Sequence, residues 1–120
     1  MADGATWLLK HALEQGGDPP DVSALLAAGQ AAQSWPAQLH VLQMLPRLSL
    51  DETTAASAYA LALRALQSER PMLRAWGYAA VDQVGGHSAA FRKEAAQILA
   101  KARQIETAGS IRARLKRCVL

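Results

Sequence analysis

The sequence predicts an all-α fold, and three of its features support this prediction. Ala and Leu dominate the apolar residues, which make up 51% of the 120-residue chain, and both favour helix over strand. Apolar residues recur at helical spacing, and no segment alternates with period two over a strand's length. Pro, Gly and Ser separate the periodic stretches. We therefore expect one domain of about seven helices.

The N-terminal part of the chain is expected to form two helices. The first would cover residues 5–15 and stop at Gly16-Gly17, because glycine accepts the left-handed conformation at a helix C-terminus. Asp18 is the expected cap of the second helix, with Pro19 at its first position. The apolar spacing of this second helix fades near Gln33.

Two further helices are expected in the middle of the chain. Either Ser34 or Trp35 would cap the third, and Pro46 would end it or bend its last turn. Ser49 and Glu52 have the spacing of a capping box, in which the two residues bond each other's backbone N–H groups. The fourth helix would then run to about residue 67.

The last three helices follow from residue 70 onward. The fifth would span residues 70–84 with Trp76 in its core-facing line, and Gly85-Gly86 would end it. Ser88 is the expected cap of the sixth helix, which would end near residue 105. Ser110 would cap the last one.

The chain also repeats itself at a nearly constant offset. Residues 37–45 align with 73–81 at an offset of 36, and 73–81 align with 111–119 at an offset of 38. The intervening helices also align at an offset of 36, so that residues 62, 63 and 66 match residues 98, 99 and 102. A unit of two helices cannot bury its apolar faces alone, and stacking of neighbouring units supplies a core.

This repeat resembles the HEAT-repeat family of α-solenoids over about residues 34–120. The resemblance is closest in the central copy, at Pro71, Leu73, Arg74, Ala79, Ala80 and Val81. It is weaker at Ile111 and Arg112. It implies a short right-handed α-α superhelix of three helix pairs, the last incomplete, in a single domain over 1–120. A degenerate pair (1–33) would precede repeats at 34–69 and 70–106 and a terminal helix at 107–120. A compact helical bundle is the alternative.

Positive charge is concentrated at the C-terminal end. The net charge is +3, but residues 88–120 alone carry eight Lys or Arg against two Glu, a balance of +6. Such a split is typical of a segment that meets an anionic partner. The alternative is that these cations offset helix dipoles in the last turns of two helices.

The sequence carries no constellation typical of an enzyme, so we expect no catalysis, cofactor or metal. Its three histidines, His11, His40 and His87, lie on separate elements, and no zinc or phosphate-binding motif occurs. Cys118 is alone and is expected to pack, although Lys116 and Arg117 beside it would lower its pKa if it were exposed. With no secretion signal or membrane span, the chain is expected to be cytoplasmic.

The predicted function is therefore a non-catalytic protein-interaction or scaffold module. In a HEAT-like stack the second helices line the concave side. Their polar positions would form a small concave surface, polar and positively charged, for an acidic peptide or helix. The six candidate contact residues on these two helices are Arg64, Gln67, Lys93, Gln97, Lys101 and Gln104. The alternative function is nucleic-acid binding through the basic C-terminal third. The apolar side of the last helix also suggests a homodimer.

Overall fold

The computed structural model describes Lys10, His11, Glu14 and residues 21–120, and every regular element among them is helical. The elements in chain order are α2 (Val22–Ala31), α3 (Trp35–Met44), the 3-10 turn η1 (Leu45–Arg47), α4 (Glu52–Leu66), α5 (Pro71–His87), α6 (Ala89–Ile105) and α7 (Gly109–Arg117). The all-α prediction is confirmed. Three described residues of the expected first helix are helical; the rest of that helix, Gly16-Gly17 and Asp18 lie outside the described residues.

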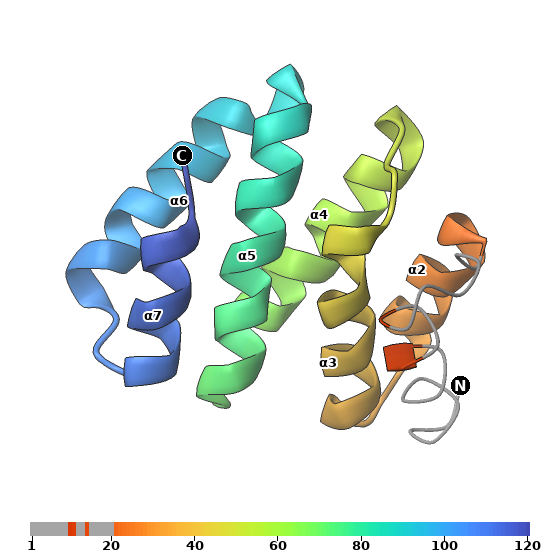
Figure 1. The fold of residues 1–120 in the computed structure, drawn as a ribbon, viewed down its shortest axis with the longest axis horizontal. Helices are drawn as coiled ribbons and strands as arrows, with labels where there is room; N and C mark the ends of the chain where they lie inside the picture. Colours follow the sequence, from red (N-terminus) through yellow and green to blue (C-terminus); the bar gives the residue numbers. More distant parts are fainter. Residues whose placement is uncertain (1–9, 12–13, 15–20) are drawn as a thin grey trace.

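The helices form two layers (Figure 1). α3, α5 and α7 lie side by side, while α2, α4 and α6 cover the other side of this row. α5 is the central helix and packs against α3, α4, α6 and α7. Its Val81 and Val84 are fully buried, as are Leu99 of α6 and Ile111 of α7. The stretch around α5 is therefore the joint between the earlier and later parts of the chain.

Equivalent residues of the three aligned segments make the same contact. Gln38, Arg74 and Arg112 occupy one position of the repeat at offsets of 36 and 38. Each side chain donates to the backbone carbonyl six residues before it, with N–O distances of 2.9, 3.1 and 3.2 Å. The bond satisfies a carbonyl in the turn that precedes each of α3, α5 and α7. The offsets read from the sequence therefore relate residues that have the same structural role.

Three of the expected helix starts are shifted. Asp21, and not Asp18, is the N-cap of α2, and its side chain accepts from the Ala24 N–H. The capping box at α4 is formed by Asp51 and Thr54, which bond each other's backbone N–H groups at 2.8 Å, so the pairing of Ser49 with Glu52 was wrong. α7 begins at Gly109 with Ala108 at its cap position.

Other boundaries agree with the sequence. Ser34 caps α3, since its hydroxyl accepts from the Ala37 N–H, and Pro46 lies in the 3-10 turn that ends this helix. Ser88 occupies the cap position of α6 as expected, but its side chain makes no capping bond.

The Gly-Gly pair of α5 does not end the helix, which continues to His87. Gly85 is buried inside it, and a Cβ atom there would lie 2.6 Å from Ala95 Cβ and 2.5 Å from Leu120 Cδ1. Gly86 has nothing within 4 Å of such an atom. The first glycine therefore allows α6 and the C-terminal residues to approach α5, and the second does not serve this purpose.

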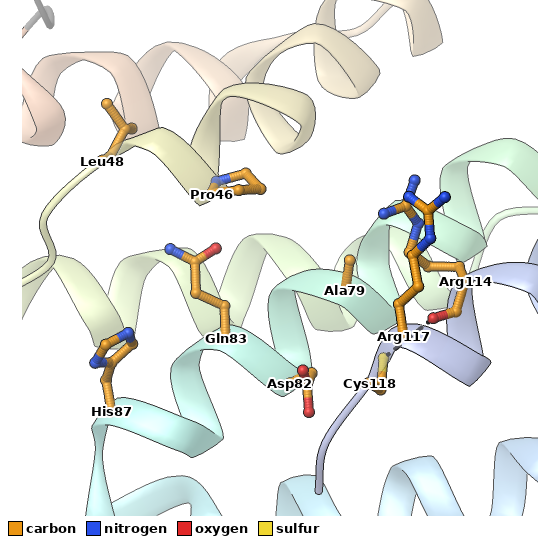
Figure 2. Close-up of a pocket in the computed structure, with 9 residues that line it drawn as sticks. All are labelled: Pro46, Leu48, Ala79, Asp82, Gln83, His87, Arg114, Arg117 and Cys118. Atoms are coloured by element: carbon orange, nitrogen blue, oxygen red, sulfur yellow. Dashed lines mark hydrogen bonds between the residues drawn. The ribbon is translucent and has the colours of Figure 1, made fainter.

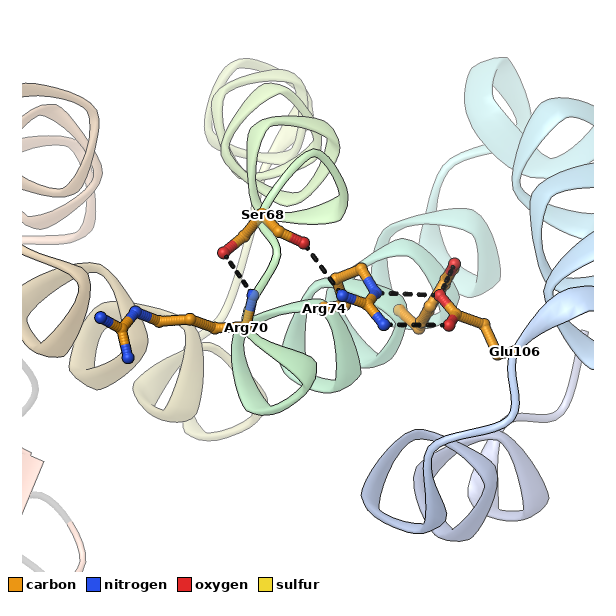
Figure 3. A network of polar contacts seen from close by, with 5 residues as sticks. Ser68, Arg70, Arg74 and Glu106 are labelled. Atoms are coloured by element: carbon orange, nitrogen blue, oxygen red, sulfur yellow. Dashed lines mark hydrogen bonds and ion pairs between the residues drawn. The ribbon is translucent and has the colours of Figure 1, made fainter.

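A polar network joins α5 to the end of α6 (Figure 3). The Arg74 guanidinium forms two parallel bonds with the Glu106 carboxylate, at 3.1 and 3.2 Å, and the Tyr78 hydroxyl donates to the same carboxylate at 2.7 Å. Arg74 also donates to the Ser68 carbonyl. Bidentate, charge-assisted bonds of this kind are among the stronger polar contacts in proteins. Arg74 therefore ties the α4–α5 turn to the α6–α7 connection.

Candidate functional site

A hollow lined by residues of η1, α5 and α7 lies between these elements (Figure 2). Its volume is about 280 Å³. α7 contributes Arg114 and Arg117 from one side, α5 contributes Gln83 and His87, and Pro46 covers the opposite side. The remaining lining residues are Leu48, Ala79, Asp82 and Cys118. The hollow thus combines cationic side chains with a small apolar wall.

Two cations of α7 line this hollow, and neither has a carboxylate partner among the residues that the structure describes. Arg114 and Arg117 are one turn apart, and no ion pair is formed by either within the described part of the chain. The Arg114 guanidinium lies 4.0 Å from the centre of the Trp76 ring. Burial and the neighbouring positive charge of Arg117 lower the pKa of Arg114. An anion bound between them would relieve this repulsion.

A second hollow of about 280 Å³ adjoins the first, because both are lined by Pro46 and Arg114. It adds Arg47 and Trp76, and also Lys10, which pairs with Glu14 at 3.5 Å. We call the two hollows together the basic groove. Its residues are Lys10, Glu14, Gln43, Pro46, Arg47, Leu48, Trp76, Ala79, Asp82, Gln83, His87, Arg114, Arg117 and Cys118.

The carboxylate of Asp82 also lines this groove, and within the described residues it forms no ion pair with Arg114 or Arg117. Its Oδ1 atom accepts two hydrogen bonds, from the Val119 and Leu120 N–H groups, each at 3.0 Å. Arg103 of α6 donates to the carbonyls of Cys118 and Leu120. The C-terminal residues are thus held on α5 and α6, in part by the Asp82 carboxylate.

Gln83 carries an unused acceptor at the edge of the groove. Its Nε2 donates to the Leu45 carbonyl at 2.8 Å, which fixes the orientation of the amide because that carbonyl can only accept. The Oε1 atom is buried, and no group of the described part of the chain donates a hydrogen bond to it. A buried acceptor of this kind costs stability unless a donor reaches it.

Cys118 is a packing residue, as expected from the sequence. It is half-buried and packs against the core. Burial and the nearby Asp82 carboxylate raise the pKa of its thiol to about 11, against the opposing effect of Arg103 and Arg114. Little of it is thiolate at neutral pH, so the thiol is a poor nucleophile.

The six contact residues predicted from the sequence lie away from the basic groove. Arg64 donates to the carbonyls of Gln30 and Ala32, and so satisfies carbonyl groups at the C-terminal end of α2. Gln67 follows the last residue of α4 and is exposed. The other four are exposed along α6: Lys93, Gln97, Lys101 and Gln104. This surface stays a prediction, with Arg64 already engaged in the fold.

The repeat contained a signal for the basic groove that was missed. At the offset of 38, Arg114 matches Trp76, so stacking neighbouring units places the two on one face. Trp76 is half-buried and packs against the core, as its place in the core-facing line predicted. Arg47 and His87 lie at the ends of their helices, and no periodic pattern indicates where they point.

The apolar face of α7 is used inside the protein. Ile111 and Leu115 are buried, whereas Val119 is 85% exposed. Leu120 packs against the core beside Gly85. The apolar side on which the homodimer prediction rested is thus covered by α5, apart from Val119.

Comparison with protein-family models, curated proteins and solved structures finds no match for this chain. Among the described residues, His, Cys, Asp and Glu side chains form no group of three or more that could hold a metal ion. The helices of this part of the chain are too short or too polar for one to cross a membrane.

Proposed function

We infer that the chain is a non-catalytic protein-interaction module of HEAT-like helix pairs, which binds an acidic segment of another protein in the basic groove. The observation that carries this is the pair of Arg114 and Arg117, two neighbouring cations without a carboxylate partner among the described residues. A guanidinium binds a carboxylate through two parallel hydrogen bonds. Glu and Asp side chains of a partner are therefore the natural occupants.

The rest of the groove suits a peptide better than a nucleic acid. Pro46, Leu48 and Ala79 offer an apolar wall, which can receive an aliphatic side chain next to the acidic one. Nucleic-acid binders commonly stack bases on aromatic rings, but one face of Trp76 is covered by Arg114.

Nucleic-acid binding remains the second candidate because of the balance of +6 over residues 88–120. Cations from α6 and α7 together would contact phosphates rather than a single carboxylate. Such binding would weaken steeply with salt, since each phosphate contact releases counterions. It would also depend on basic residues outside the groove as much as on those inside it.

A charge reversal on α7 separates these possibilities. The probes are a fluorescent peptide of alternating Glu and Leu and a fluorescent random-sequence DNA duplex, both followed by anisotropy at low salt. Arg117→Glu places a carboxylate in the groove, whereas Lys116→Glu makes the same change of charge on the next residue, which is exposed outside it. Circular dichroism checks that both variants fold.

We expect the peptide to bind, and Arg117→Glu to weaken it about tenfold, a loss of about 1.4 kcal/mol. Lys116→Glu should change its affinity by less than about twofold, because exposed charges outside a contact contribute little. Equal weakening of the duplex by both variants, with no peptide binding, would instead support the nucleic-acid function. Absence of binding to either probe would reject both.

A further inference from the structure

A second and larger groove lies between the N-terminal ends of α4 and α6. Its volume is about 740 Å³. Most of its lining is apolar: Leu50, Ala55, Ala56, Ala89, Ala90 and Phe91. Asp51, Glu52, His87 and Ser88 complete it. It is open because four of the apolar residues that face it are alanines, whose side chains leave space between the two helices.

Phe91 lines this groove, and its ring is held in position by a second ring. Phe91 of α6 stacks on Tyr59 of α4, with ring centres 4.4 Å apart and the planes inclined by 28°. Tyr59 is only 4% exposed, and its hydroxyl donates to the Glu94 carboxylate at 2.7 Å. Phe91 is half-buried, so one part of its ring remains available. A partner side chain would therefore meet a surface that is already ordered, which reduces the entropy lost on binding.

Two carboxylates line this groove, in contrast to the arginines of the basic groove. Asp51 and Glu52 line the α4 side and are exposed. Hydrogen bonds from the Thr54 N–H and hydroxyl lower the pKa of Asp51, so it is ionised at neutral pH. Glu94 lies beside the two rings through its bond with Tyr59. Within the described residues, none of these three carboxylates forms an ion pair with Lys, Arg or His.

From these observations we propose a second interaction site in this groove, for a basic amphipathic segment of a partner protein. A bulky apolar side chain of the segment packs on the exposed part of Phe91, between the alanines of α4 and α6. Lysine or arginine side chains next to it pair with Asp51 and Glu52. Central apolar anchors surrounded by polar contacts are the usual arrangement of binding energy in interfaces. His87 lines both grooves, but the ligand of this site has the opposite charge, and Phe91, Asp51 and Glu52 lie at the N-terminal ends of α4 and α6, outside the basic groove.

The exposed face of α4 provides a test with a matched control. Ala56 lines the groove, and Ala60 is one turn further along the same helix, also exposed but outside the lining. Ala56→Arg fills the groove and adds a positive charge beside Glu52, while Ala60→Arg makes the same substitution away from it. Both are tolerated in a helix, since Arg is a good helix former. The probe is a fluorescent amphipathic peptide of Lys and Leu, titrated into the full chain.

We expect saturable binding that Ala56→Arg weakens at least about tenfold and that Ala60→Arg leaves unchanged. Backbone amide resonances of Ala55, Ala56 and Phe91 should shift on titration. No binding, or equal weakening by both variants, would overturn the proposal. So would a concentration-dependent dimer in sedimentation that only Ala56→Arg dissociates, because the groove would then be covered by a second copy.

Discussion

Glu106 shows how one residue can stabilise contacts between several parts of the chain. Its side chain is mostly buried, and it accepts from Arg74 and Tyr78. Burial alone would raise the pKa of Glu106, but the hydrogen bonds from Arg74 and Tyr78 outweigh this effect and lower it. Burial and the bond with Glu106 likewise raise the pKa of Tyr78, so its hydroxyl stays protonated and continues to donate.

Glu106→Gln is expected to lower the free energy of unfolding by about 1–3 kcal/mol at pH 7, since hydrogen bonds to a charged group are lost. A lowered pKa in the folded state means that this stabilisation is complete above the unfolded value, near 4.5, and is lost as the pH falls through the folded value. Urea unfolding of the wild-type protein and of Glu106→Gln between pH 3 and 7 measures this difference in the free energy of unfolding. A difference that does not shrink toward acid would contradict the role of the charge.

At the scale of elements, alanine substitutions of the two glycines at the end of α5 are expected to change stability in opposite directions. Gly85→Ala should destabilise the protein by about 1–3 kcal/mol, because the new methyl group would clash with Ala95 and Leu120. Gly86→Ala should stabilise it by about 0.5–1 kcal/mol, because Ala is the better helix former and meets nothing there. Thermal unfolding of the two variants decides this. Two destabilising changes would indicate that α5 ends before these residues.

The helices and their order could be predicted from the sequence, whereas several of their ends could not. Apolar spacing is a local property, and it placed every described helix. The choice of Asp51 over Ser49 as a cap depends on where the chain turns after η1. The continuation of α5 through Gly85 depends on packing against Ala95, which lies on another helix. These helix boundaries depend on tertiary contacts, which the local spacing of apolar residues does not contain.

At the scale of the molecule, the basic groove joins residues of α3, η1, α5 and α7 that lie far apart in the sequence. The charge of the C-terminal third fitted either an anionic partner or the compensation of helix dipoles, and it did not indicate a binding surface. The sequence pattern favoured the polar positions of the second helices, whereas the groove lies between the first helices of the repeats. Within the sequence, the repeat offset of 38 was the one feature that indicated the contact between Arg114 and Trp76.

Side-chain NMR of the full chain tests most directly whether an acidic peptide binds in the basic groove. Titration with the Glu-Leu peptide should shift the Nε–Hε resonances of Arg114 and Arg117 and the side-chain amide of Gln83. The side-chain amides of Gln67, Gln97 and Gln104 should not move, because these residues do not line the groove. Shifts confined to those three glutamines, with Arg114 and Arg117 unaffected, would contradict the account and favour the surface of α4 and α6.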